Sequence, residues 1–305
     1  MTAPFLTHKQ CLIARYGAPL YRVPVSFGFG CPNRDPHGQG GCAFCDESGA
    51  SSIIAQDADD MAEQVRRGVD FARSRYGAKR FMAYVQSFTG TFAPVNHQRA
   101  LYAELLSLAP FDALCVATRP DCLSSDTLAL LAELRQRLDV LVELGVQTVH
   151  DATLHRIGRG HDWECSRRAI GDLAARDLLV VAHVILGLPG ETRDHFRQTA
   201  EALARLPLAG VKLHNLHVLR GTRMAAEFAR APFPVYGPED YADVVIDCIR
   251  RLPPNVAVMR INTDSPPARL IAPRWEISKG QFRDVVMRMM RARGVRQGDL
   301  FLKDL

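Results

Sequence analysis

The sequence predicts an α/β protein: a partial (β/α)6 barrel of the TIM type, followed by a helical extension at its C-terminal end. Segments of strand character alternate along the chain with segments whose apolar residues recur at helical spacing. The stretch 178–186 is almost wholly apolar, which is typical of a strand covered on both faces. This alternation indicates βα units and a parallel sheet, and 305 residues suffice for one such barrel.

Each expected element is marked by its own residues. Pro120 should stop the strand that ends at Thr118, because proline lacks the N–H that a sheet needs. Asn96, and either Ser124 or Ser125, have side chains suited to capping the helices that follow them. We expect strands at 23–27, 80–86, 113–118, 140–146, 178–186 and 211–219, with a last short strand at 256–261. We expect helices at 57–76, 96–108, 124–138, 164–176, 192–206, 239–252 and 278–293.

These elements divide the chain into an N-terminal segment (1–22), the barrel (23–262) and a C-terminal extension (263–305). The last helix is basic, because 279–296 holds six Lys or Arg residues against one Asp. Five apolar residues spaced along one face should pack it onto the barrel: Phe282, Val285, Val286, Met289 and Met290. Its arginines should then face solvent near the barrel mouth, where they can meet phosphates: Arg283, Arg288, Arg291 and Arg293.

The composition is that of an ordinary globular protein, with 47% apolar and 23% charged residues. A net charge of +5 permits a nucleic-acid partner without requiring one. No apolar run approaches the roughly 20 residues that span a membrane, and the first ten residues do not resemble a secretory signal. We therefore expect a cytoplasmic protein with no membrane partner. Clustered cysteines in that reducing compartment indicate metal ligands rather than disulfides.

Three of the eight cysteines form such a cluster. Cys31, Cys42 and Cys45 have the spacing C-x10-C-x2-C in a glycine-rich stretch. A [4Fe–4S] cluster usually takes four cysteines, so three leave one iron open to a small molecule. Zinc is the structural alternative, with His37 or Asp46 as a fourth ligand. Spacing alone does not separate the two metals, since thiolates suit both.

Further polar segments fall at or just after the expected strand ends, where barrel enzymes hold their active sites. They are Gln86–Thr91, Glu143–Gln147 and Gly187–Glu191. A carboxylate is rarely buried without a partner, so Glu143 should have one inside the barrel. The coincidence of these segments with the cysteine loop predicts one shared site.

Together, seven stretches resemble the radical S-adenosylmethionine (SAM) superfamily. Within it they resemble the bacterial YhcC-type proteins, whose SAM core is close to that of the catalytic subunit of Elongator. The stretches are CPNRD (31–35), GGCAFC (40–45), TRPDC (118–122), ELGVQ (143–147), LHRIGRGHD (154–162), GLPGE (187–191) and KLHNLH (212–217). The long gap between the first two cysteines, and QSFTGT (86–91) in place of the usual Gly-Gly-Glu, are similar to the Elongator-like branch.

The resemblance implies that the three cysteines bind a [4Fe–4S] cluster and that SAM chelates its fourth iron. A reduced cluster then cleaves SAM, and a 5′-deoxyadenosyl radical abstracts a substrate hydrogen. It further implies a reductase or a flavodoxin- or ferredoxin-type protein as electron donor. Phe44 is expected near the adenine, although Phe is also common in cores.

The remaining SAM contacts are implied in the same way. Gln86, Ser87 and Thr89 should lie by the methionine amino group, or form a plain surface turn. Glu143 and Gln147 should contact the ribose and methionine parts. Arg159 should grip the carboxylate bidentately, or be a surface arginine. Gly187 should let the backbone approach the adenine, or simply form a strand-to-helix turn. These SAM-binding candidates are Phe44, Gln86, Ser87, Thr89, Glu143, Gln147, Arg159 and Gly187.

The substrate implied is tRNA, at the side chain of the wobble uridine. The alternatives are a radical SAM enzyme acting on a small metabolite or a peptide, and a zinc-bound RNA-binding protein without enzymatic activity. A chain of 305 residues leaves no room for an acetyltransferase domain like Elongator's, so acetyl-CoA chemistry is not expected. Four residues are candidates for facing the substrate, with an inert core role as the alternative for each: Cys122, His183, His214 and His217.

Overall fold

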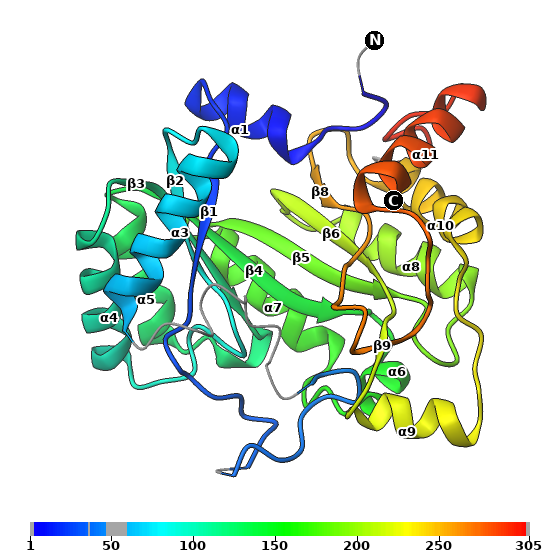
Figure 1. Cartoon of the computed structure of the whole chain (residues 1–305), viewed down its shortest axis with the longest axis horizontal. Helices are drawn as coiled ribbons and strands as arrows, with labels where there is room; N and C mark the ends of the chain where they lie inside the picture. Colours follow the sequence, from blue (N-terminus) through cyan, green and yellow to red (C-terminus); the bar gives the residue numbers. More distant parts are fainter. Residues whose placement is uncertain (1–2, 36, 47–59, 303–305) are drawn as a thin grey trace.

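A computed structural model describes residues 3–35, 37–46 and 60–302. Its main feature is a curled sheet of seven parallel strands, a half-barrel with helices around it (Figure 1). The strands lie in the order β1-β2-β3-β4-β5-β6-β8, so each βα unit adds one strand beside the previous one. Their bounds are β1 Tyr21–Val25, β2 Phe81–Val85, β3 Phe111–Thr118, β4 Asp139–Gln147, β5 Leu179–Leu186, β6 Gly210–Asn215 and β8 Ala257–Arg260.

Helices connect the strands and cover the outer face of the sheet (Figure 1). They are α1 His8–Tyr16, α3 Met61–Tyr76, α4 Val95–Ser107, α5 Ser125–Arg135, α6 Asp151–Arg156, α7 Trp163–Ala174, α8 Arg193–Ala204, α9 Arg223–Arg230, α10 Pro238–Arg251 and α11 Lys279–Ala292. A 3-10 turn, η1 (Pro120–Cys122), follows β3. A small antiparallel pair, β7 (Val218–Leu219) with β9 (Leu270–Ala272), joins the extension to the barrel.

Strand β4 shows how the two faces of the sheet differ. Val140, Val142 and Leu144 are fully buried in the large core cluster that the sheet shares with the surrounding helices. Leu141 points to the opposite face and belongs to a separate cluster with Leu12 of α1. Glu143 follows on that same inner face and is buried as well. The inside of the barrel is therefore apolar toward the N-terminal strand ends and polar toward the C-terminal ends.

The predicted barrel is confirmed, and most differences have a local cause. Asn96 does not cap its helix, because α4 starts one residue earlier and Pro94 is its N-cap, without a side-chain hydrogen bond. Ser124 does cap α5, by accepting a hydrogen bond from the Thr127 amide. The strand expected at 211–219 is two strands, β6 and β7, separated by residues 216–217. The first residues of the helix expected at 57–76 lie outside the described residues, and α3 accounts for the rest.

Helix α1, which the sequence pattern did not predict, closes the N-terminal end of the barrel. Arg15 and Tyr16 both bond the carboxylate of Asp139, the first residue of β4. Gln297, near the other end of the chain, also holds this region. Its side-chain oxygen accepts from the Leu6 backbone amide at 2.8 Å, and its backbone amide donates to Pro4 O at 3.0 Å. The two ends of the described chain are thus bonded side by side.

The basic helix α11 packs as expected but lies elsewhere than expected. Phe282, Val286 and Met290 are fully buried, whereas Val285 and Met289 are only half-buried. The expected arginines are exposed. However, α11 starts at the rim of the barrel mouth and ends beside the segment that precedes β8, at the N-terminal edge of the sheet. The expectation that Arg288, Arg291 and Arg293 lie near the mouth is therefore wrong.

None of the helices in the described part of the chain is both long and apolar enough to cross a membrane.

The anchoring of α1 gives a prediction about stability. The hydrogen bond from Arg15 holds the pKa of Asp139 below its usual value. A carboxylate with a lowered folded-state pKa stabilises the fold above its unfolded pKa, and that contribution is lost as pH falls. Asp139→Asn should therefore lower the free energy of unfolding by roughly 1–3 kcal/mol at pH 7, and by progressively less below about pH 4. Urea unfolding at pH 7 and pH 3 measures both values, with the surface variant Asp70→Asn as control. An equal loss at both pH values would contradict this account.

Candidate active site

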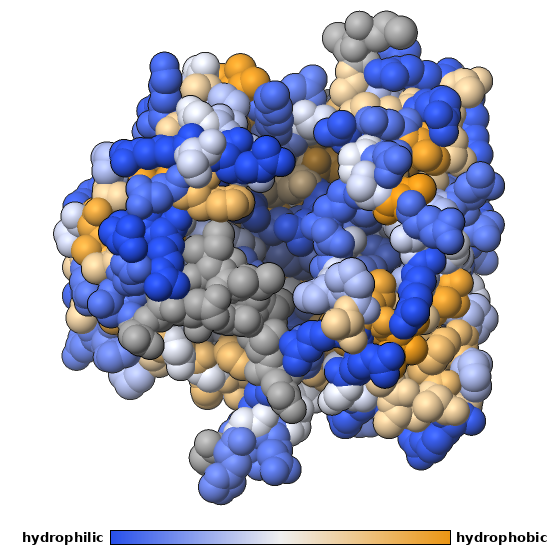
Figure 2. All heavy atoms as spheres, viewed as in Figure 1, coloured by the Kyte–Doolittle hydropathy of each residue, from blue (hydrophilic) through white to orange (hydrophobic). Residues whose placement is uncertain are grey.

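The cysteine loop and residues at or just after the ends of β2, β4, β5, β6 and β8 line one cavity at the C-terminal edge of the sheet, with a volume of about 550 Å³, whereas the segment 187–191 does not. Figure 2 shows this face of the molecule hollowed at its centre, where the surface is mostly hydrophilic. One wall comes from the cysteine loop and from the segments after β2 and β4, and the other from β5, β6 and the segment after β8. Seven of the residues expected at the site line it: Phe44, Cys45, Gln86, Gln147, His183, His214 and His217.

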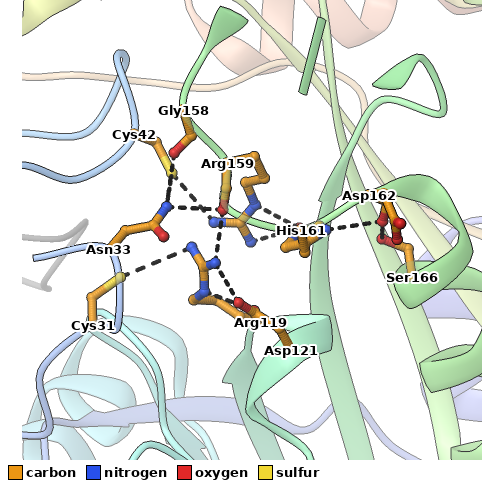
Figure 3. Close-up of polar contacts among 11 residues, drawn as sticks. Cys31, Asn33, Cys42, Arg119, Asp121, Gly158, Arg159, His161, Asp162 and Ser166 are labelled. Carbon is orange, nitrogen blue, oxygen red and sulfur yellow. Dashed lines mark hydrogen bonds and ion pairs between the residues drawn. The ribbon is translucent and has the colours of Figure 1, made fainter. Parts of the chain in front are cut away.

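Asn33 attaches the cysteine loop to the barrel. Its side-chain amide donates to the backbone oxygens of Gly158 and Arg159, at 2.8 Å each, and lies 3.5 Å from the Cys42 sulfur (Figure 3). The approach is so close that a Cβ on Gly160 would meet the Asn33 side-chain oxygen at 2.3 Å. Only glycine fits there, which explains its place in the segment 154–162.

Each of the three clustered cysteines has a guanidinium against its sulfur. Arg159 lies 3.5 Å from Cys42 and Arg34 lies 3.6 Å from Cys45. Arg119, just after β3, lies 4.0 Å from the sulfur of Cys31 (Figure 3). Such donors stabilise a thiolate over a thiol.

The pKa values of the two better-buried thiols differ. Burial opposes ionisation of Cys42, but the charge and hydrogen bond of Arg159 outweigh it and lower its pKa. For Cys45, burial prevails over the Arg34 hydrogen bond and raises the pKa. No group of three or more His, Cys, Asp or Glu side chains among the described residues, the three clustered cysteines included, is arranged as around a bound metal ion, so the structure does not separate zinc from an iron–sulfur cluster. Asp46 pairs with Arg269 at 2.9 Å.

Arg159 joins this loop to strand β4. Besides contacting Cys42, its guanidinium donates to Gly145 O, at 2.6 Å from one terminal nitrogen and 3.2 Å from Nε. A Cβ on Gly145 would meet the guanidinium at 2.6 Å, so a larger residue here would displace the Arg159 side chain. Arg159 is 94% buried and is not among the residues that line the cavity. It is therefore not the surface arginine that was the structural alternative.

Glu143 lies beneath the cavity, at the centre of a buried ionic cluster. Its Oε1 accepts from Arg22 at 2.8 Å. Its Oε2 accepts from Lys212 at 2.5 Å, from Tyr84 at 2.9 Å and from His183 at 3.1 Å. The carboxylate does have partners inside the barrel, as expected, but it does not line the cavity. We call Arg22, Tyr84, Glu143, His183 and Lys212 the Glu143 cluster.

The charges in this cluster set its protonation. Burial alone would raise the pKa of Glu143, but Arg22 and Lys212 hold it well below its usual range. Burial and the charge of Arg22 lower the pKa of Lys212, because two cations share one carboxylate. Sequence reasoning missed Arg22, Tyr84 and Lys212. The available signal was charge inside strand segments that are otherwise apolar, Arg22 in β1 and Lys212 in β6.

The loop after β2 and the last residue of β4 have unusual backbone geometry. Ser87 and Phe88 have φ values of 97° and 47°, and Gln147 has 72°. Non-glycine residues with positive φ are strained, and such strain is concentrated at functional sites. The hydroxyls of Ser87 and Thr89 are buried and have no hydrogen-bond partner within the described residues. Unpaired buried hydroxyls are costly, which makes them candidates for ligand contacts.

The remaining expected residues fall in three places. Gly187 has φ of 99° and faces Tyr236, where an added Cβ would be 3.3 Å from the ring, outside the main cavity. Phe44 lines the cavity and also packs against a core cluster, so it fits both interpretations. Cys122 is near Cys31 rather than in the cavity wall, and burial raises its pKa to about 12.

Two polar groups of β6 are unsatisfied in the cavity wall. The Nε2 atom of His214 and the side-chain nitrogen of Asn215 are both buried without a hydrogen-bond partner within the described residues. Asn215 was not expected at the site. His217, by contrast, is fixed by Ser265, whose hydroxyl lies 2.9 Å from its Nδ1.

Comparison with known proteins agrees with this architecture. A family model for the radical SAM superfamily matches residues 25–203, and one for the Radical_SAM C-terminal domain matches 208–292. Protein YhcC of Escherichia coli K12 is 40% identical over 266 residues, which is 87% of this chain and 85% of YhcC. The tRNA uridine(34) acetyltransferase of Methanocaldococcus infernus is 27% identical over 187 residues, 60% of this chain and 34% of that protein.

The fold has a counterpart among solved structures. The archaeal Methanocaldococcus infernus Elp3 superposes with a TM-score of 0.73 at 19% sequence identity, covering 91% of this chain and 64% of that chain. The family model spans more than half of the sequence, and YhcC matches it over most of the length of both proteins. The chain therefore belongs to the radical SAM superfamily.

Proposed function

We propose that this protein is a radical SAM enzyme that modifies tRNA, with a [4Fe–4S] cluster on Cys31, Cys42 and Cys45 and SAM in the adjoining cavity. The observation that carries the proposal is the placement of an arginine against each of these three sulfurs, at the C-terminal edge of the sheet. When bound, the cluster supplies the electron that cleaves SAM reductively to methionine and a 5′-deoxyadenosyl radical, which abstracts a substrate hydrogen.

The donor set of this loop suits an iron–sulfur cluster. N–H groups directed at cysteine sulfurs stabilise thiolate ligands and tune the reduction potential of a cluster. Asn33, Arg34, Arg119 and Arg159 supply such groups here. Three thiolates leave one iron for SAM, and Cys45 and Phe44 belong to the cavity wall, so the loop can present that iron to the cavity.

The residues around the cavity suit the polar end of SAM. The unpaired hydroxyls of Ser87 and Thr89 can bond the methionine amino and carboxylate groups, as can Gln147 in its strained conformation. Arg159 is fixed by Gly145 and Cys42 beside this end of the site, and a guanidinium can grip a carboxylate through two parallel bonds. The contribution of these residues is to hold and orient the cofactor and to exclude water.

tRNA is the substrate class that relatives favour. The similarity to a tRNA uridine(34) acetyltransferase and the fold shared with Elp3 suggest the wobble uridine as the target. Arg260 and Arg269 lie in the cavity wall, and Lys279 at the start of α11 pairs with Asp264 of that wall. Cations at this rim can contact the phosphates that flank a nucleotide inserted into the cavity.

Iron content tests the cluster. Anaerobically reconstituted protein should hold about four irons per chain, and Cys31→Ala, Cys42→Ala and Cys45→Ala should each lose them. Cys248→Ala should retain them, because Cys248 is buried against α8 with its sulfur 3.8 Å from Phe196 O. Stoichiometric zinc without iron in the wild type would instead favour the zinc-bound RNA-binding protein.

SAM binding tests Arg159. Arg159→Ala should weaken SAM binding by at least tenfold while the iron content stays near that of the wild type, because the cysteines remain. Arg159→Lys keeps the positive charge but loses the two parallel N–H groups of the guanidinium. Its affinity for SAM should therefore lie between those of the wild type and Arg159→Ala. Equilibrium binding of SAM to the reconstituted proteins gives the numbers. If Arg159→Ala binds SAM as tightly as the wild type does, Arg159 is not a SAM-binding residue.

Measurements of tRNA binding compare the cavity rim with the basic helix α11, using two double variants that each remove two positive charges. Arg260→Gln with Lys279→Gln should lower affinity for bulk tRNA and flatten its salt dependence by roughly one unit per lost phosphate contact. Arg288→Gln with Arg291→Gln should change both much less, because these residues are remote from the mouth. Binding at several salt concentrations measures the slopes. Equal effects would indicate non-specific attraction, and no tRNA binding at low salt would favour a small metabolite or a peptide as substrate.

A further inference from the structure

His183 is the one member of the Glu143 cluster that also lines the cavity. Its Nε2 atom lies 3.1 Å from Glu143 Oε2. Its Nδ1 atom has no hydrogen-bond partner within the described residues, and 18% of its side chain is accessible. The imidazole therefore connects a buried carboxylate on one side with the cavity on the other.

The carboxylate determines which nitrogen of this imidazole carries the proton. An ionised carboxylate only accepts hydrogen bonds. Glu143 is ionised, because Arg22 and Lys212 both contact it in the barrel interior. The group that faces it must donate, so Nε2 of His183 bears hydrogen. Burial, aided by the charge of Lys212, lowers the pKa of His183 to about 4, so the ring is neutral at physiological pH and its Nδ1 carries a lone pair.

We propose that His183 is a substrate-binding residue that presents Nδ1 to the cavity as a hydrogen-bond acceptor, and that Glu143 is its positioning residue. The ligand group that meets it is an N–H or O–H donor, such as the imide of a pyrimidine base, an amine or a hydroxyl. Arg22 and Lys212 act through Glu143, since they keep the carboxylate ionised and fixed.

The adjoining wall is consistent with a polar ligand. The ring of His214 lies 5.4 Å from that of His183, and its Nε2 atom is buried without a partner within the described residues. Burial also lowers the pKa of His214 well below its usual range, so this second imidazole is neutral too. The charged groups that approach the pair come from three strands: Glu143 on β4, Lys212 on β6 and Arg260 on β8. None of them replaces the missing partner at His183 Nδ1.

Nitrogen NMR of the histidine side chains tests the tautomer without any substrate. In the reconstituted wild type at pH 7, His183 should be neutral, with hydrogen on Nε2 and none on Nδ1. Tyr84→Phe removes another donor to the same carboxylate oxygen and should leave this tautomer unchanged. In Glu143→Gln the amide can donate to His183, so the Nδ1–H tautomer should appear. A wild-type His183 that is doubly protonated, or carries hydrogen on Nδ1, would overturn the proposal even if Glu143→Gln fails to fold.

A pair of substitutions tests the contact with substrate. In His183→Asn the side-chain oxygen can occupy the place of Nδ1, so the acceptor is kept. In His183→Gln the amide reaches the place of Nε2, so the bond to Glu143 is kept and the acceptor is lost. A purely structural role predicts that Gln is better tolerated, whereas the proposal predicts that Asn is better by at least tenfold in kcat/KM.

The comparison of His183→Asn with His183→Gln rests on the proposed function. Its substrate is tRNA purified from cells that lack the gene, and turnover is divided by the rate of SAM cleavage without tRNA for each variant. A higher normalised turnover in His183→Asn than in His183→Gln supports the acceptor role of Nδ1. An equal or higher turnover in His183→Gln overturns it. Absence of SAM cleavage in the wild type would overturn the proposed function instead, and the NMR result would still decide the tautomer.

Discussion

The buried charge of Glu143 is the constraint on which the inside of this barrel depends. A carboxylate removed from water must be paired and hydrogen-bonded, and here its partners come from four other strands: Arg22 from β1, Tyr84 from β2, His183 from β5 and Lys212 from β6. Removing one partner of a buried ion pair typically costs roughly 3–5 kcal/mol. The cluster therefore fixes the relative positions of strands that contribute the cavity walls, and it separates the apolar floor closed by α1 from the polar mouth.

The conformation of the cysteine loop is fixed by side chains from outside the ordinary secondary structure. This loop is long and rich in glycine, so its conformation must be imposed by the groups around it. Asn33, Arg119 and Arg159 impose it, because each contacts both a cysteine sulfur and the backbone of another segment. The same N–H groups that shape the loop also stabilise thiolate charge. The same residues therefore serve both the shape of the loop and the charge of its cysteines.

The sequence predicted the barrel well, because buried parallel strands such as 178–186 are continuous apolar runs and amphipathic helices have a distinct period. It placed Cys45, Gln86 and Gln147 at one edge of the sheet for a related reason, since strand ends of a parallel sheet share one edge. It did not predict α1, whose single buried residue, Leu12, gives no helical pattern. Nor did it predict the role of Lys212, because a single charge in a strand does not reveal which distant carboxylate it meets. Nor did it predict the contacts of Gln297 just after α11, which no local pattern encodes.

The bonds of Gln297 to Pro4 and Leu6 also bear on how the protein is made. A chain emerging from the ribosome produces its N-terminal end first, and the partner of that end is nearly 300 residues away. Pro4 and Leu6 must therefore wait for this partner long after Arg15 and Tyr16 of α1 can bond Asp139, and contacts of such long sequence separation form slowly. During that interval α1 can already cover the apolar floor beneath the Glu143 cluster, but the segment before α1 lacks its bonds to Gln297. Residues near 297 therefore act late in folding, although they are far from the active site.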